Sequence, residues 1–184
     1  INRALIETTA ANNGGMVGFN QYGTINYCAN YGNIIAENQN TGGIVGRFNA
    51  GTVSNCYNQG EISGTNNTGG IAGFTYQLAT AISDCINKGK IKSGNAATPG
   101  GILGGANVGI TISDCYNAGE IYGNNVNKSV SHSLSGSAYA TLSNCWYENY
   151  DNAGTAKAGS SVMSEAEINT AIQNLLNTIT SGNN

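Results

Sequence analysis

The sequence predicts an all-β fold: a parallel β-solenoid, or β-helix, of about five coils of 28–30 residues with a C-terminal capping α-helix. The first observation is a row of cysteines spaced by 28, 29, 30 and 30 residues, at Cys28, Cys56, Cys85, Cys115 and Cys145. The second is that Asn, Gly and Ile follow the first four cysteines after two, four and six residues. The third is a phrase of two glycines, two apolar residues and a glycine, which begins at Gly14, Gly42, Gly69 and Gly100. Units of this size stack into a solenoid, because one unit alone cannot bury its apolar face.

The two-residue spacing within each unit predicts an extended chain, because alternate side chains of a strand share one face. The inward rows are then the cysteines and the four asparagines Asn30, Asn58, Asn87 and Asn117. We expect reduced thiols that pack as small apolar groups, and amides that hydrogen-bond to one another along the stack. Each coil is expected to hold three short β segments, such as "GGIVG", "TVS" and "CYNQGEI", with a bend near Asn55 and its equivalents. A right-handed coil is favoured by the general rule for parallel crossovers.

The ends of the chain differ from the repeats. The organisation predicted is an N-terminal segment or imperfect first coil, the repeats, a spacer, and a helix with a tail, at residues 1–13, 14–150, 151–163 and 164–184. The helix is predicted from Glu165 to Asn177, because Ser164 and Glu167 have the spacing of a capping box and apolar residues follow on one stripe. We expect it over the last coil or its flank, since an open solenoid end exposes unpaired backbone groups.

Composition excludes several classes of function. Only 9% of the residues are charged, the net charge is −3, and no Lys/Arg cluster is present, so a nucleic-acid partner is not expected. No apolar run approaches the roughly 20 residues of a transmembrane helix. Disorder is not expected either, because 40% of the residues are hydrophobic. The chain begins with Ile1, and we interpret it as part of a larger parent protein.

Residues that could carry catalysis are few, and we expect no enzyme activity, no catalytic residue, no metal and no cofactor. The single histidine, His132, lies in the least regular unit and receives no role. Asp84 and Asp114 occupy equivalent positions before their cysteines, where two carboxylates about 5 Å apart could bind Ca²⁺ or serve a polysaccharide-processing enzyme. No basic residue recurs beside them, so turn residues that cap backbone groups are the favoured interpretation.

Two outward rows are the candidate contact surfaces. The first is a Thr-x-Ser stripe composed of Thr24, Thr52, Thr111 and Thr141, with Ser54, Ser83, Ser113 and Ser143. Rows of small hydroxyl groups on a flat solenoid face resemble ice-binding surfaces, but β propensity alone also explains threonine on strands. The second row follows the cysteines and contains Tyr57, Tyr116 and Trp146. These aromatic side chains could bind sugar rings or a protein partner, or could cover the bend against a neighbouring segment.

The repeated phrase "NTGGIVGRFNAGTVSNCYNQGEISG", at residues 40–64, resembles the GLUG-motif repeats of bacterial secreted and cell-surface proteins. That family includes streptococcal immunoglobulin-A-cleaving metallopeptidases and adhesin-like proteins. The resemblance covers roughly residues 14–177, including the closing "NCWYENY", but the stretch "SVSHSLSG" departs from the glycine-pair pattern.

What the resemblance implies is a non-catalytic structural or adhesive module, located outside the cell or on the bacterial surface. Such a module would serve as a stalk or as a ligand-display surface. Its partner would be a glycan or a protein on a host or neighbouring cell. The alternatives are an ice-binding protein that uses the Thr-x-Ser face and a polysaccharide-processing β-helix enzyme.

Overall fold

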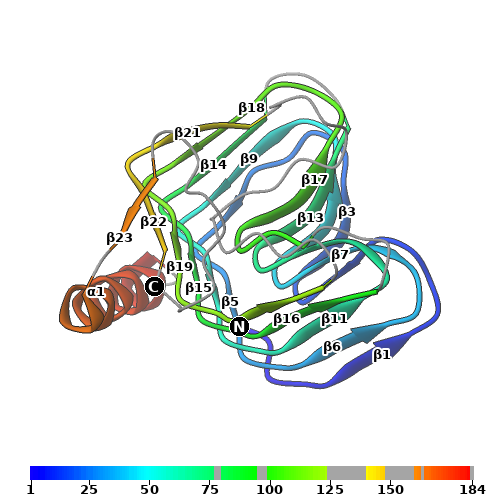
Figure 1. Ribbon diagram of the computed structural model, residues 1–184, viewed down its shortest axis with the longest axis horizontal. Coiled ribbons are helices and arrows are strands. Elements are labelled where there is room, and N and C mark those ends of the chain that lie inside the picture. Colours follow the sequence, from blue (N-terminus) through cyan, green and yellow to red (C-terminus); the bar gives the residue numbers. More distant parts are fainter. Residues whose placement is uncertain (77–79, 95–98, 124–139, 148–159, 163, 183–184) are drawn as a thin grey trace.

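The chain forms a β-solenoid of about four turns, built from parallel sheets, with one C-terminal helix (Figure 1). The computed structural model describes residues 1–76, 80–94, 99–123, 140–147, 160–162 and 164–182. The predicted fold class is therefore confirmed, and the number of turns is slightly lower than the five coils expected. His132 and most of the predicted spacer lie outside the described residues.

One turn of the solenoid contains five short strands where the sequence predicted three segments. The second turn is composed of β6 (Ile34–Ala36), β7 (Gln39–Gly42), β8 (Val45–Phe48), β9 (Gly51–Ser54) and β10 (Tyr57–Asn58). Each strand pairs in parallel with its equivalents one turn before and one turn after, so the five strand positions give five sheets. We number the sheets 1 to 5 after their N-terminal strands β1 to β5.

The remaining strands take the same positions in the other turns. Sheet 1 adds β1 (Ile6–Thr8), β11 (Ile62–Gly64), β16 (Ile91–Ser93) and β20 (Ile121–Tyr122) to β6. Sheet 2 adds β2 (Asn13–Gly14) and β12 (Asn66–Gly69) to β7, and sheet 3 adds β3 (Val17–Asn20), β13 (Ala72–Thr75) and β17 (Leu103–Ala106) to β8. Sheet 4 adds β4 (Ile25–Asn26), β14 (Thr80–Ser83), β18 (Ile110–Ser113) and β21 (Ala140–Ser143) to β9. Sheet 5 adds β5 (Ala29–Asn30), β15 (Ile86–Asn87), β19 (Tyr116–Asn117), β22 (Cys145–Tyr147) and β23 (Ser160–Val162) to β10.

Both ends of the repeat region join the stack. Strands β1 and β2 pair with β6 and β7, so they begin the first turn, which continues through β3, β4 and β5, and Asn2 forms a parallel bridge with Asn30 of β5 ahead of that turn. Strand β23, which lies within the predicted spacer, pairs with β22 at the other end of sheet 5.

The bend between sheets 4 and 5 is at the predicted place. Asn55, Asp84, Asp114 and Asn144 directly precede the cysteines and have φ values of 49°, 53°, 52° and 48°. Asn and Asp tolerate this left-handed conformation better than other residues with a side chain. This turn chemistry accounts for Asn or Asp before the last four cysteines, whereas Tyr27, before Cys28 in the first turn, adopts the same conformation with φ 53°.

The cysteines form the predicted inward row. Cys56, Cys85, Cys115 and Cys145 are fully buried, Cys28 in the first turn is half-buried, and all five are free thiols. They pack with aliphatic side chains such as Ile44, Val53 and Ile82 in one continuous core. Burial raises the pKa of the Cys85 thiol well above its ordinary value, so this thiol stays neutral.

The asparagines form a continuous hydrogen-bonded row, as predicted. Asn30 Nδ2 donates to Asn58 Oδ1 at 2.8 Å, Asn58 Nδ2 to Asn87 Oδ1 at 2.8 Å, and Asn87 Nδ2 to Asn117 Oδ1 at 2.7 Å. Asn2 Nδ2 extends the row by donating to Asn30 Oδ1 at 2.7 Å. Each of the four predicted amides also donates to the carbonyl of the glycine two residues later.

The glycine pairs make room for this row. A Cβ at Gly43 would overlap Gly70 O and the amide of Asn58, and one at Gly101 would overlap the amide of Asn117. The second glycine of each pair therefore lies against an asparagine of the row across the solenoid. This close approach explains why the two phrases repeat together.

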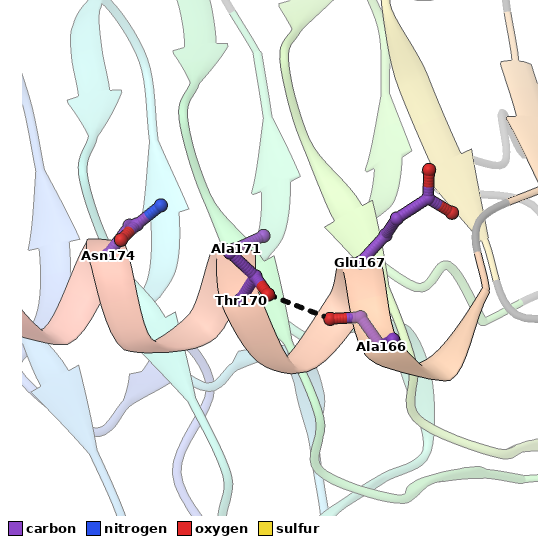
Figure 2. Close-up of a pocket in the computed structure, with 5 residues that line it drawn as sticks. All are labelled: Ala166, Glu167, Thr170, Ala171 and Asn174. Carbon is purple, nitrogen blue, oxygen red and sulfur yellow. Dashed lines mark hydrogen bonds between the residues drawn. The ribbon is translucent and has the colours of Figure 1, made fainter.

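The C-terminal helix α1 (Glu165–Gly182) lies on the flank of the solenoid and extends beyond the predicted Asn177. Its N-terminus has the predicted capping box, in which the Ser164 N–H and Oγ–H donate to the Glu167 carboxylate at 2.9 and 2.6 Å. Figure 2 shows the helix crossing the strands from the last turn toward the first. Its Gly182 end reaches Tyr27 of the first turn. At about 1.5 Å per residue the helix is roughly 27 Å long, enough to cross four strand spacings of about 4.8 Å each.

Candidate functional site

The Thr-x-Ser stripe lies on sheet 4 in the register that the sequence predicted. Thr52, Ala81, Thr111 and Thr141 pair one above another, and Ser54, Ser83, Ser113 and Ser143 do the same. Thr24 continues the threonine row in the first turn, since Thr52 Oγ1 donates to Thr24 Oγ1 at 3.4 Å. The four threonines are exposed, whereas the serines before Ser143 are half-buried. The stripe is thus an outer surface.

The aromatic row on sheet 5 is not an outer platform, which corrects one of the two predictions for it. Tyr57 and Tyr116 are each only 2% exposed, and Trp146 is half-buried. They pack in one cluster with the buried helix residues Ile168, Ile172, Leu175 and Ile179. Burial raises the pKa of Tyr57 to about 12. The apolar stripe of α1 needs an apolar partner, and the side chains that follow the cysteines supply it.

A different aromatic surface is exposed at sheet 3, and the sequence interpretation did not include it. Phe19, Arg47 and Phe74 occupy paired positions on β3, β8 and β13. Phe19 is 47% exposed and Tyr76, just beyond β13, is 48% exposed, while Arg47 and Phe74 are half-buried. We call these four residues the sheet 3 patch. The available signal was the residue after the last glycine of the repeated phrase, which is Phe19, Arg47 or Phe74 in the first three turns.

The guanidinium of Arg47 lies between two rings of the sheet 3 patch. Its Cζ is 5.5 Å from the ring centroid of Phe19 and 5.0 Å from that of Tyr76, within cation–π range. The rings of Phe74 and Tyr76 are 6.4 Å apart at an angle of 43°. Arg47 Nε donates to Asn49 Oδ1 at 3.0 Å, which fixes the plane of the guanidinium. These contacts hold the aromatic rings of the patch and the positive charge of Arg47 together on one surface.

The carboxylates of Asp84 and Asp114 line a shallow groove between the bend and α1. This groove has a volume of about 230 Å³, and its other lining residues include Asn55, Asn174 and Thr178. Asn144 Nδ2 donates to Asp114 Oδ1 at 3.3 Å. The described lining residues contain no Lys, Arg or His that could act with the two carboxylates as a general acid or stabilise a developing negative charge. The two carboxylates therefore have an open groove but no described catalytic companion.

A second hollow runs along α1 itself. Figure 2 shows Ala166, Glu167, Thr170, Ala171 and Asn174, which line a space of about 410 Å³. Glu167 is its only ionisable residue among those described, and its two bonds from Ser164 lower its pKa. Since Glu167 closes the capping box, its carboxylate is already used in the fold.

Opposite charges alternate between turns on the outer face near sheet 1. Lys90 Nζ lies 3.4 Å from Glu120 Oε2, and Lys92 Nζ lies 2.6 Å from Glu61 Oε1. Lys90 also lies over the ring of Tyr122 at 4.3 Å. Such exposed pairs contribute little to stability, because solvent screens them.

Comparison with protein-family models, curated proteins and solved structures gives no match to this chain. Within the described residues, no cluster of three or more His, Cys, Asp or Glu side chains could hold a metal ion. No described helix is both long and apolar enough to cross a membrane.

Proposed function

We propose that this chain is a non-catalytic structural and adhesive β-solenoid module of a bacterial cell-surface or secreted protein, which serves as a stalk or ligand-display surface. One observation carries the proposal: the repeated inward cysteines and asparagines hold the turns together. The residues left for contact with a partner are those on the outer faces, such as the threonine row of sheet 4. Any contact with a partner then involves the outer faces. A glycan or protein on a host or neighbouring cell is the proposed partner.

The interior of the solenoid supports a structural role. The asparagine row links four successive turns and Asn2 by direct side-chain hydrogen bonds of 2.7 to 2.8 Å. Helix α1 packs across the same turns on sheet 5 and buries four apolar side chains there. A module built this way keeps its outer faces at fixed spacing, which suits the display of a ligand.

The resemblance to GLUG-motif repeats supports the extracellular setting, and it rests on the residues of the repeat alone. Five free thiols packed as core residues do not oppose that setting, because the buried ones are shielded from oxidants. The groove lined by Asp84 and Asp114 gives little support to the polysaccharide-processing alternative, because its described lining residues include no basic residue.

The test is a binding screen of the full chain against arrays of glycans and against extracts of bacterial and host cell surfaces. We expect saturable binding to a subset of glycans or to a surface protein, with no turnover of the bound molecule. Background signal in every arm would refute the adhesive role. Release of shortened saccharides would refute the non-catalytic one.

A second candidate, ice binding, is favoured by one observation. The exposed threonines of sheet 4 are stacked in register, interrupted only by Ala81 among the paired positions. Thermal hysteresis of the full chain decides this, with Thr111→Leu as the variant that removes a central hydroxyl group. A freezing behaviour equal to that of buffer eliminates the candidate.

A further inference from the structure

We infer that the sheet 3 patch, formed by Phe19, Arg47, Phe74 and Tyr76, is a binding site for a carboxylated saccharide such as a uronate oligomer. The inference deepens the proposed function, on which it rests, by naming a face of the solenoid and a class of ligand. In Figure 1 the strands β3, β13 and β17 lie across the solenoid from α1, so this face is separate from the aromatic cluster under the helix.

The rings give the site its sugar-binding character. Phe19 and Tyr76 expose 47% and 48% of their surface, and both lie against the same guanidinium. Exposed aromatic faces bind the apolar C–H faces of pyranose rings, and Arg47 lies in contact with both of these rings. Across the paired strands β3, β8 and β13 the patch spans two strand spacings, about 10 Å.

The charge of Arg47 gives the site its preference for an acid. No Asp or Glu lies within salt-bridge distance of Arg47 among the described residues, since the two described pairs involve Lys90 and Lys92. Its Nε–H is used by Asn49, and its remaining guanidinium N–H groups have no described acceptor. A planar guanidinium with free donors matches the geometry of a carboxylate. The patch is thus a local positive site on a chain of net charge −3.

The size of the patch favours a small ligand over a protein. An aromatic side chain presents about 150–250 Å², so three rings that are half exposed or less offer roughly 200–350 Å². A stable protein interface buries about 800 Å² on each partner. The sheet 3 patch is therefore suited to one or a few sugar units.

A matched control exists on another face. Tyr122 is 45% exposed and lies under Lys90, so it repeats the pairing of a ring with a cation. The charge of Lys90, however, is balanced by Glu120 at 3.4 Å. If exposed aromatic–cation pairs bound uronates in general, Tyr122 would matter as much as Tyr76.

The experiment titrates the full chain with oligogalacturonate, oligoguluronate and hyaluronan oligomers, each against its methyl-esterified form, by isothermal calorimetry. We expect saturable binding of at least one free acid and at least about tenfold weaker binding of its ester, because the charge-assisted hydrogen bonds are lost. Arg47→Gln and Tyr76→Ala are expected to weaken binding at least about tenfold, Arg47→Lys to an intermediate degree, and Tyr122→Ala not at all. Thermal unfolding of each variant confirms that it is folded, and Tyr76→Ala lies beyond the end of β13 and leaves the strand pairing intact.

The outcomes separate this inference from the proposed function. Binding of a free acid that is equal in Arg47→Gln, Tyr76→Ala and Tyr122→Ala overturns the site while leaving glycan display standing. Equal binding of acid and ester overturns the recognition of the carboxylate. Absence of saccharide binding together with saturable capture of a surface protein overturns the ligand class only, and background in every arm overturns the display function as well.

Discussion

Asn87 is the position at which the asparagine row can be tested most sharply, because its side chain is fully buried and bonded on both sides. Its Nδ2 donates to Asn117 Oδ1 at 2.7 Å and to Gly89 O at 2.9 Å. Its Oδ1 accepts from Asn58 Nδ2 at 2.8 Å and from Gly89 N at 3.2 Å. Asn87→Ala removes these bonds, and at about 1 kcal/mol net for each of four bonds the free energy of unfolding falls by about 4 kcal/mol.

Urea unfolding followed by circular dichroism measures this loss. With a slope of about 2 kcal/mol per molar urea, the midpoint is expected to fall by about 2 M. The control is Lys88→Ala, because Lys88 is the exposed next residue and its truncation should change stability by less than about 0.5 kcal/mol. A loss below about 1 kcal/mol for Asn87→Ala, or equal losses for the two variants, would refute the claim that the row holds the turns together.

Further predictions concern the glycines, the helix and the thiols. Gly43→Ala should lower the urea midpoint by an amount worth about 1–3 kcal/mol, because the new Cβ overlaps Gly70 O and Asn58, and an unchanged midpoint would contradict that overlap. Ile179→Ala should cost about 2–4 kcal/mol, while the exposed neighbour Thr180→Ala should cost little; similar values would show that α1 is not packed on sheet 5. A thiol reagent should modify the half-buried Cys28 in the native chain and all five cysteines in urea, and rapid native modification of all five would contradict the buried row. Because burial raises the pKa of Cys85 while the unfolded thiol ionises near pH 8.5, the free energy of unfolding should decline above about pH 8.5, and less steeply in Cys85→Ala.

The spacing of residues in the repeat was sufficient to predict the interior. Side chains two residues apart share a face of any strand, so the cysteine and asparagine rows followed from the sequence and are present in the structure. The number of strands in a turn did not follow, because the glycine-rich stretches contain bends that a period of two does not describe. A second asparagine row was missed for the same reason: Asn67 Nδ2 donates to Asn40 Oδ1 at 2.7 Å, and Asn40 Nδ2 to Asn12 Oδ1 at 2.8 Å.

The outer surface was harder to predict, because a repeat does not say which of its faces another element covers. Tyr57 and Tyr116 point away from the solenoid core as predicted, but the flank chosen by α1 buries them. The position of α1 depends on contacts between the C-terminal end of the chain and successive turns, which the repeat pattern does not describe. The sheet 3 patch was missed because Phe19, Arg47 and Phe74 are different residue types at one repeat position, and their grouping appears only when the turns are stacked.

A map of backbone amide chemical shifts during titration of the full chain with a uronate oligomer locates the contact surface of the solenoid. We expect the shifted amides to cluster around the sheet 3 patch and to saturate with one affinity. The amides of sheet 5 beneath α1 should stay unchanged. Shifts that cluster on another face, or no shifts at saturating ligand, would contradict the assignment of the sheet 3 patch as the contact surface of this solenoid.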